Sequence, residues 1–331
     1  MIPFSYTRAT DVDQTTLQLA SAPRAKCIGG GTNLLDLMKM GVETPEQLID
    51  VNPLPLAKIE EIDGAGGLRI GALARNSDVA EHPLVIKRYP LLREALLSGA
   101  SPQLRNMATV GGNLLQRTRC PYFCDPAFPA CNKRKPGSGC GALEGFNRMH
   151  AILGQSDHCI ATHPSDMCVA LAALDAVIHV SGPQGKREIP MREFHRLPAN
   201  TPEIETTLQP SELIVAVDLP RLGFSENSAY IKVRDRASYA FAVVSVAAGL
   251  EMASDGSIKT ARIALGGVAH KPWRAFDAEP LLIGKRPNAE VFAQAAEMAL
   301  AGARGYKQNK FKIELARRSI VRALAVAAHA G

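Results

Sequence analysis

One long stretch of the sequence, from about residue 114 to 162, lacks the apolar periodicity of both helices and strands. Five of the seven cysteines lie in it, among many Pro, Gly and basic residues. A segment of this length without secondary structure is unusual in a compact domain and is normally functional. The odd number of cysteines, without a secretory signal, argues against a disulfide framework. We therefore expect the stretch to be functional, and its clustered cysteines indicate a metal site.

Before this stretch, strand and helix signals alternate around glycine-rich turns. Residues 25–28 are expected to form a short apolar strand, and Thr32 is expected to N-cap the helix that follows. Helical periodicity extends over 76–98, with interruptions at Pro83 and Pro90. The alternation predicts two small α/β lobes.

After the stretch, the order of elements changes. Strand signals at 228–234, 241–251 and 258–265 are followed by helical patterns at 289–302 and 312–328. Strands followed by helices indicate a domain of the α+β class. The expected division of the chain is 1–57 for the first lobe, 58–222 for the second lobe with its insertion, and 223–331 for the C-terminal domain.

Composition and charge exclude several classes of protein. The 331 residues carry a net charge of +6, but the Lys and Arg residues are scattered and form no aromatic-interleaved stripe that would indicate nucleic-acid binding. No apolar stretch is long enough for a membrane span. Because the N-terminus carries no secretory signal, the chain by itself is expected in the cytoplasm. A folded partner with an export signal could still carry it elsewhere.

The glycine run Gly29–Gly31 is suited to binding a phosphate group. Glycines let backbone N–H groups approach an anion, and Thr32 and Asn33 add short polar side chains. The Rossmann fingerprint fails here because its third glycine would fall at Leu34, and a Walker Gly-Lys-Ser/Thr sequence is absent. The alternative is an ordinary glycine turn before a helix.

A second loop of the same character occurs at Thr109-Val110-Gly111-Gly112-Asn113. Two glycine loops with short polar side chains fit a dinucleotide that is held between two subdomains. Two unrelated turns of common composition remain the alternative.

Taken together, these motifs resemble the FAD-binding subunits of molybdenum hydroxylases, the family of xanthine dehydrogenase and carbon monoxide dehydrogenase. In that family, loops of the types Gly-Gly-Thr-Asn/Asp-Leu and Thr-Val-Gly-Gly-Asn bind the FAD pyrophosphate. A Ser-Asp step reaches the adenosine side, and a Lys on a later strand contacts the cofactor. The resemblance covers nearly the whole chain. It implies an α+β protein: a two-lobed α/β FAD-binding domain of the PCMH/VAO-like type, not Rossmann, and a C-terminal α+β domain of the CO dehydrogenase flavoprotein type.

Carried over to this sequence, the resemblance implies a set of FAD-binding residues. For three of them a structural role is the alternative: Asp166 as a helix N-terminal charge, Lys232 as a surface lysine and Leu213 as a core residue. The implied residues are Lys26, Cys27, Ile28, Gly29, Gly30, Gly31, Thr32, Asn33, Leu34, Thr109, Gly112, Asn113, Asp166, Leu213 and Lys232.

The insertion resembles that of the FAD subunits of bacterial periplasmic aldehyde oxidoreductases, and less closely that of the β subunit of 4-hydroxybenzoyl-CoA reductases. The resemblance implies a [4Fe–4S] cluster bound by Cys120, Cys131, Cys140 and Cys159, with Cys124 as the alternative to Cys120. Zinc is the other alternative, although only Cys120 and Cys124 have the spacing of a zinc pair. The basic run 133–135 would offset the charge of a cluster, or form a solvated turn or a docking patch.

The function implied is that of an FAD-binding, electron-transferring subunit of a molybdenum-containing aldehyde oxidoreductase. Electrons would come from a large molybdenum-cofactor subunit through a small [2Fe–2S] subunit, and FAD would pass them to an external acceptor. No catalytic acid–base or nucleophile pair is found in the sequence, so the chain is expected to host redox cofactors. Co-export with a signal-bearing partner would place this heterotrimer in the periplasm. The alternatives are a 4-hydroxybenzoyl-CoA reductase-like subunit, a stand-alone flavin oxidase and a zinc-stabilised, non-catalytic assembly module.

Overall fold

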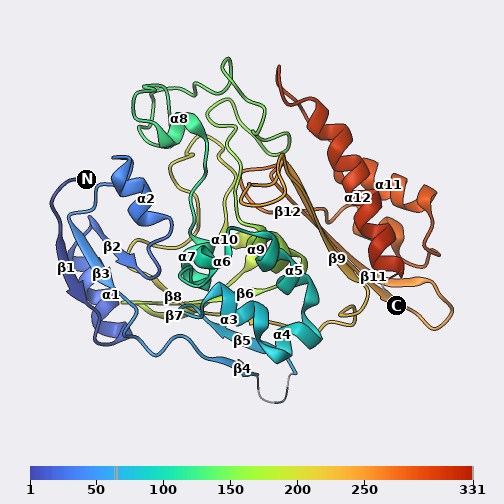
Figure 1. Ribbon diagram of the computed structural model, residues 1–331, viewed down its shortest axis with the longest axis horizontal. Coiled ribbons are helices and arrows are strands. Elements are labelled where there is room, and N and C mark those ends of the chain that lie inside the picture. The colour runs from blue at the N-terminus through green and yellow to red at the C-terminus, as the bar shows by residue number, and fades with distance from the viewer. Residues whose placement is uncertain (63, 65, 330–331) are drawn as a thin grey trace.

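Three β-sheets organise the part of the chain that the structure describes (Figure 1). The structure is a computed structural model that describes residues 1–62, 64 and 66–329. In the view of Figure 1, the first sheet lies on the left, the second in the lower middle and the third on the right. The insertion lies above the second sheet, between the N-terminal and C-terminal parts.

The first sheet is small and entirely parallel. Its strand order is β1-β3-β2, so that two strand–helix–strand connections place β3 in the centre. The first helix is N-capped by Asp11, whose carboxylate accepts a 2.8 Å hydrogen bond from the amide of Gln14. The elements are β1 (Ser5–Arg8), α1 (Val12–Ser21), β2 (Ala25–Ile28), α2 (Leu34–Lys39) and β3 (Gln47–Asp50).

The second sheet is antiparallel, with the strand order β4-β5-β8-β6-β7. Pro83 and Pro90 each occupy the first turn of a new helix, which confirms the interruptions predicted there. Its strands are β4 (Ile59–Glu61), β5 (Leu68–Gly71), β6 (Val177–Gly182), β7 (Gly185–Pro190) and β8 (Leu213–Leu219). Its helices are α3 (Asn76–Glu81), α4 (Pro83–Arg88), α5 (Pro90–Ser98), α6 (Pro102–Arg105), α7 (Val110–Leu114), α9 (Asp166–Ala173) and α10 (Met191–Phe194).

A charged cluster joins three strands on one face of this sheet. Both carboxylate oxygens of Asp218 accept hydrogen bonds of 2.7 Å from the guanidinium of Arg69, and the Nε2 atom of His179 lies 2.7 Å from one of them. Burial raises the pKa of Asp218, but the hydrogen bond from Arg69 and the nearby His179 outweigh it and keep the pKa below its ordinary value.

The insertion contains little regular structure. Within it, α8 (Pro121–Cys124) is a single turn, and antiparallel bridges pair Cys131 with Cys140 and Ser156 with Cys159. Turns and loops make up the rest, as the missing periodicity predicts.

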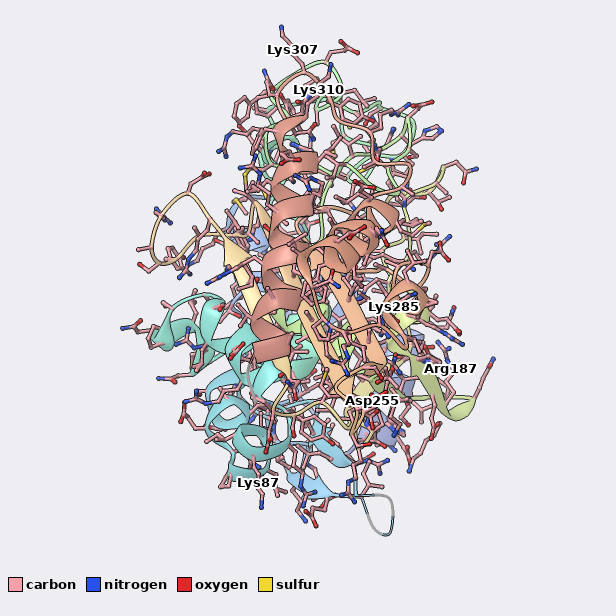
Figure 2. All side chains as sticks on the ribbon, turned by 90° about the vertical axis from the view of Figure 1, so that its right-hand side faces the viewer. Lys87, Arg187, Asp255, Lys285, Lys307 and Lys310 are labelled. Carbon is pink, nitrogen blue, oxygen red and sulfur yellow. The ribbon has the colours of Figure 1, made fainter. Side chains whose placement is uncertain are left out.

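The third sheet is antiparallel, with the order β12-β11-β10-β9. Helices α11 and α12 cover one of its faces, as Figure 2 shows for α12, and α9 packs against β10 and β11. Residues 244–250 of β10 are all buried, as expected for a strand covered on both faces. The elements are β9 (Ser228–Val233), β10 (Val244–Met252), β11 (Ile258–Gly266), β12 (Trp273–Arg274), the short 3₁₀ helix η1 (Glu279–Leu282), α11 (Ala289–Ala299) and α12 (Phe311–His329).

The architecture confirms the predicted fold class. Only the three-stranded sheet is parallel, whereas a Rossmann fold needs an open, mostly parallel sheet with helices on both faces. Among the described helices, none is both long and apolar enough to cross a bilayer.

Candidate cofactor site

The first glycine loop connects β2 to α2 and offers backbone donors to an anion. Gly31 adopts a φ of +70°, which favours glycine. The amides of residues 30 to 33 donate to no acceptor within the described chain, so several N–H groups are available at one turn. Helix α2 begins at Leu34 with Asn33 as its N-cap, so the prediction that Thr32 caps this helix is wrong. The oxygen of the Asn33 side chain instead accepts the amide of Arg117 at 3.0 Å.

The second glycine loop packs directly against the first. A Cβ atom at Gly30 would collide with the backbone carbonyl of Met107, and one at Gly29 would lie 3.2 Å from the hydroxyl of Thr109. The expected juxtaposition of the two loops is therefore present. Unlike those of the first loop, the amides of residues 110 to 113 already have acceptors: Thr109 N-caps α7 through the amide of Gly112 at 3.1 Å, and the amide of Gly111 donates to Ala72.

Two residues that sequence reasoning missed hold the loops together. The side-chain amide of Asn52 donates to the carbonyl of Gly29 at 3.1 Å and accepts from Arg75 at 3.0 Å. The same guanidinium also donates to the carbonyl of Met107. Because these contacts join segments that are distant in the sequence, no local motif marks them.

Asp166 and Lys232 meet as a buried ion pair. The Nζ atom of Lys232 lies 2.7 Å from Oδ2 of Asp166 and 2.9 Å from the carbonyl of Ser98. The hydroxyl of Tyr230 donates to the other carboxylate oxygen at 2.7 Å. Only 4% of the lysine side chain and 7% of the aspartate side chain are exposed, so Lys232 is not a surface lysine.

The remaining residues implied by the resemblance surround these groups. Asn113 accepts a 2.8 Å hydrogen bond from the hydroxyl of Ser165, which joins the second loop to the start of α9. Leu213 packs in the apolar core of the first lobe. Lys26 is exposed on β2, and burial raises the pKa of the Cys27 thiol to about 12.

A cavity of about 110 Å³ lies where the insertion, the start of α9 and the third sheet meet. Pockets that enclose whole small molecules usually measure about 300–1,000 Å³, so this one fits only part of a dinucleotide. Three of the residues that line it, Arg119, His150 and His163, each have a buried nitrogen without a partner in the described residues. The buried Nδ2 atom of Asn33 is unpartnered as well. Buried polar groups are normally satisfied, so these atoms indicate a polar ligand. The cavity is lined by residues 118–121, 149–150, 162–166, 241–242, 245 and 266–267.

Of the four cysteines proposed as cluster ligands, Cys120 lines this cavity. The thiol of Cys120 lies close enough to interact electrostatically with those of Cys131 and Cys159, and the thiol of Cys159 interacts with that of Cys140. Cys124, like Cys120, packs against Cys131, and its thiol donates to the carbonyl of Thr118 at 3.7 Å. Burial raises the pKa of Cys120 to about 12 and that of Cys159 to about 11.

The thiols of these cysteines do not form a close group of the kind that a single zinc ion binds. Ligand sulfurs of a tetrahedral zinc site stand about 3.8 Å apart, as follows from Zn–S bonds of about 2.3 Å. No three of these thiols in the described chain lie within 4.8 Å of one another.

The basic run of the insertion is structural. The Nζ atom of Lys133 is buried, 2.6 Å from Glu205 and 2.6 Å from Nε2 of His270, and Arg134 donates to the carbonyls of Tyr122 and Phe123. The alternative predictions that Lys133 belongs to a solvated turn or a docking patch are therefore wrong. Burial raises the pKa of Glu205, but the charge of Lys133, with that of Arg117, holds it well below its ordinary value.

One group of three potential metal ligands stands apart from the cysteine cluster. Ligand atoms of His163, Cys168 and His195 lie within 4.8 Å of one another. The Nε2 atom of His195 donates to the backbone carbonyl of Leu114 at 2.8 Å. The thiol of Cys168 donates to the backbone carbonyl of Asn113 at 3.8 Å. Burial raises the pKa of Cys168 to about 12, which keeps the thiol neutral. These contacts fasten α7 to its neighbours, so we assign the group a structural role.

Comparison with known proteins identifies the family. The sequence model described as the FAD binding domain in molybdopterin dehydrogenase matches residues 2–222. The chain belongs to this family of FAD-binding proteins. The CO dehydrogenase flavoprotein C-terminal domain matches residues 228–327, so the two matches together extend over nearly the whole chain.

Relatives and solved structures agree with this assignment. The chain is 55% identical over 329 residues to the aldehyde oxidoreductase FAD-binding subunit PaoB of Escherichia coli, covering 99% of both chains. It is 28% identical to the glyceraldehyde dehydrogenase medium chain of Sulfolobus acidocaldarius, covering 88% of this chain and 85% of the relative. Carbon monoxide dehydrogenase of Hydrogenophaga pseudoflava has the same fold, with a TM-score of 0.76, 28% identity and coverage of 99% and 98%. Quinoline 2-oxidoreductase of Pseudomonas putida 86 also has this fold, with a TM-score of 0.75 and 26% identity. The match covers 99% of this chain and 97% of the other.

The residues present fit the FAD that the family binds. The free amides of the first loop suit a phosphate, and the glycines allow the two loops to touch where a Cβ atom would separate them. The unpartnered nitrogens around the cavity offer further polar contacts. The chain is therefore an FAD-binding subunit of the oxidoreductase type, as the sequence motifs predict.

Proposed function

We propose that this chain is the FAD-binding, electron-transferring subunit of a molybdenum-containing aldehyde oxidoreductase. The observation that carries the proposal is its 55% identity to an aldehyde oxidoreductase FAD-binding subunit over 99% of both chains. When bound, FAD takes up two electrons and passes them on. The residues of the chain would hold it: amides of residues 30–33 at the pyrophosphate, and Asp166 with Lys232 beside the second loop.

A [4Fe–4S] cluster is the second cofactor that we propose. Its ligands would be Cys120, Cys131, Cys140 and Cys159, because their thiols approach one another across the insertion. Cys124 would lie outside the ligand set, since its thiol already donates to the carbonyl of Thr118. Lys133 supports the proposal, because its positive charge acts on the thiol of Cys159 and favours the thiolate that binds iron.

The partners proposed are a large subunit with the molybdenum cofactor and a small [2Fe–2S] subunit, together forming a heterotrimer. An external acceptor would take the electrons from FAD. This proposal rests on the relatives, which include the medium chains of glyceraldehyde and carbon monoxide dehydrogenases. We also propose that a signal-bearing partner exports the folded complex to the periplasm. This can be tested by fractionating cells that express the chain with and without its partner subunits.

Cofactor analysis of the purified protein tests the proposal. Denatured protein is expected to release FAD, and the protein should contain iron and acid-labile sulfide in equal amounts, about four of each per chain. Absence of released flavin would refute the assignment as a flavoprotein. Zinc in place of iron would favour a zinc-stabilised assembly module. A comparison of turnover rates with a range of aldehydes and with an aromatic acyl-CoA thioester would distinguish the two enzyme types. An aldehyde oxidoreductase should turn over the aldehydes, and a 4-hydroxybenzoyl-CoA reductase-like enzyme the thioester.

A further inference from the structure

One of the histidines that line the cavity also touches one of the proposed cluster ligands. The Nε2 atom of His150 lies 3.1 Å from the sulfur of Cys120. His150 is only 4% exposed, and both residues line the cavity beside the start of α9. No other histidine contact to the sulfur of a cysteine in the insertion is found among the described residues.

The C-terminal domain holds this histidine in place. The carbonyl of His150 accepts hydrogen bonds from Nδ2 of Asn309 at 3.1 Å and from Nζ of Lys312 at 2.8 Å. Both donors are completely buried. Figure 2 shows Lys307 and Lys310, from the same segment at the start of α12, at the end of the molecule where the insertion lies. The backbone of His150 is therefore held by residues from a different part of the chain than the one that carries the cysteine.

The hydrogen-bonding state of the ring follows from its surroundings. A cluster-bound thiolate carries no proton and can only accept, so the hydrogen between the two residues must belong to Nε2. The Nδ1 atom of His150 is buried without a partner among the described residues, so no contact there opposes this tautomer.

We propose that His150 is a positioning residue for the [4Fe–4S] cluster, donating its Nε2 hydrogen to the sulfur of Cys120. The inference rests on the proposed function, because it requires the cluster. Reduction of the cluster adds one electron and no proton, so the negative charge on its sulfurs increases. A hydrogen bond to a ligand sulfur stabilises the more negative state and raises the reduction potential. His150 would thereby set how readily the cluster takes an electron from the reduced flavin.

The test is the midpoint potential of the cluster in the cofactor-loaded protein, followed by EPR during a redox titration. His150→Phe removes the donor and retains a ring of similar size. We expect about a tenfold loss in the equilibrium constant for one-electron reduction, which lowers the potential by about 59 mV. His150→Gln keeps a side-chain N–H and is expected to restore part of the shift. His158→Phe is the matched control, because this exposed histidine of the insertion makes no side-chain contact to a described thiol.

Iron content separates the outcomes. A protein without iron before any substitution would refute the proposed cluster, and with it the part of the proposed function on which this inference rests. Iron retained in His150→Phe with an unchanged potential would overturn the inference, because the ring would then only pack against the thiol. Iron lost from both His150 variants but kept in His158→Phe would also overturn it, since His150 would then be needed to hold the cluster and not to tune it.

Discussion

Replacement of Lys232 by Met should destabilise the protein strongly, because it leaves a buried carboxylate without its counter-ion. The two side chains are 4% and 7% exposed and their charged atoms lie 2.7 Å apart. After the substitution, only the hydroxyl of Tyr230 would still donate to the carboxylate of Asp166. Removing one partner of a buried ion pair costs about 3–5 kcal/mol. At about 2–4 °C per kcal/mol for folding units of 150–250 residues, the midpoint of thermal unfolding should fall by about 6–20 °C.

A matched control separates burial from the ion pair itself. Lys259 pairs with Glu251 at nearly the same distance, 2.8 Å, but its side chain is 62% exposed. Lys259→Met is therefore expected to cost less than about 1 kcal/mol. The double variant Asp166→Asn, Lys232→Met should be more stable than Lys232→Met alone, because the uncompensated charge is gone. Calorimetry of flavin-free protein measures all four unfolding midpoints. Equal losses in the Lys232 and Lys259 variants would refute the reasoning.

Three further predictions test other parts of the structure. Gly30→Ala should abolish FAD retention during purification, measured as flavin per chain, whereas Gly29→Ala, with a milder contact, should keep most of it. Cys124→Ala should retain iron and sulfide, whereas Cys120→Ala should lose them. The opposite result would make Cys124 the cluster ligand in place of Cys120. Asp218 has a pKa below its ordinary 3.8, so its stabilising effect is complete above that value and is lost as the pH falls through the lower folded value. The thermal unfolding midpoint of Asp218→Asn should therefore lie furthest below that of the unchanged protein at pH 7. The difference between the two midpoints should decrease as the pH is lowered.

Local chemistry allowed much of the fold to be predicted. Proline fixes φ and removes a donor, so Pro83 and Pro90 divide the helical region where the sequence places them. The loss of periodicity over about 114–162 likewise marks a segment that forms almost no regular elements. The start of α2 was not predicted correctly. Its apparent cap, Thr32, follows a glycine with positive φ, and the helix begins only after Asn33.

The side-chain partners inside the site could not be predicted, because they join residues that are distant in the sequence. The sequence marks Asp166 and Lys232 as separate cofactor residues, but not as a pair. Asn52 and Arg75 belong to no motif, and their role appears only when the first two lobes are packed together. His150 has no ligand spacing, since its partner Cys120 reaches it through the folding of an irregular segment.

A reductive titration of the anaerobic, cofactor-loaded protein tests the central claim most directly. If the chain binds one FAD between its glycine loops and one [4Fe–4S] cluster in its insertion, it should take up about three electrons: two on the flavin and one on the cluster. The electron on the cluster should give an EPR spectrum. Cys131→Ser should abolish this spectrum without removing the flavin. Uptake of only two electrons, with zinc among the thiols, would contradict the account.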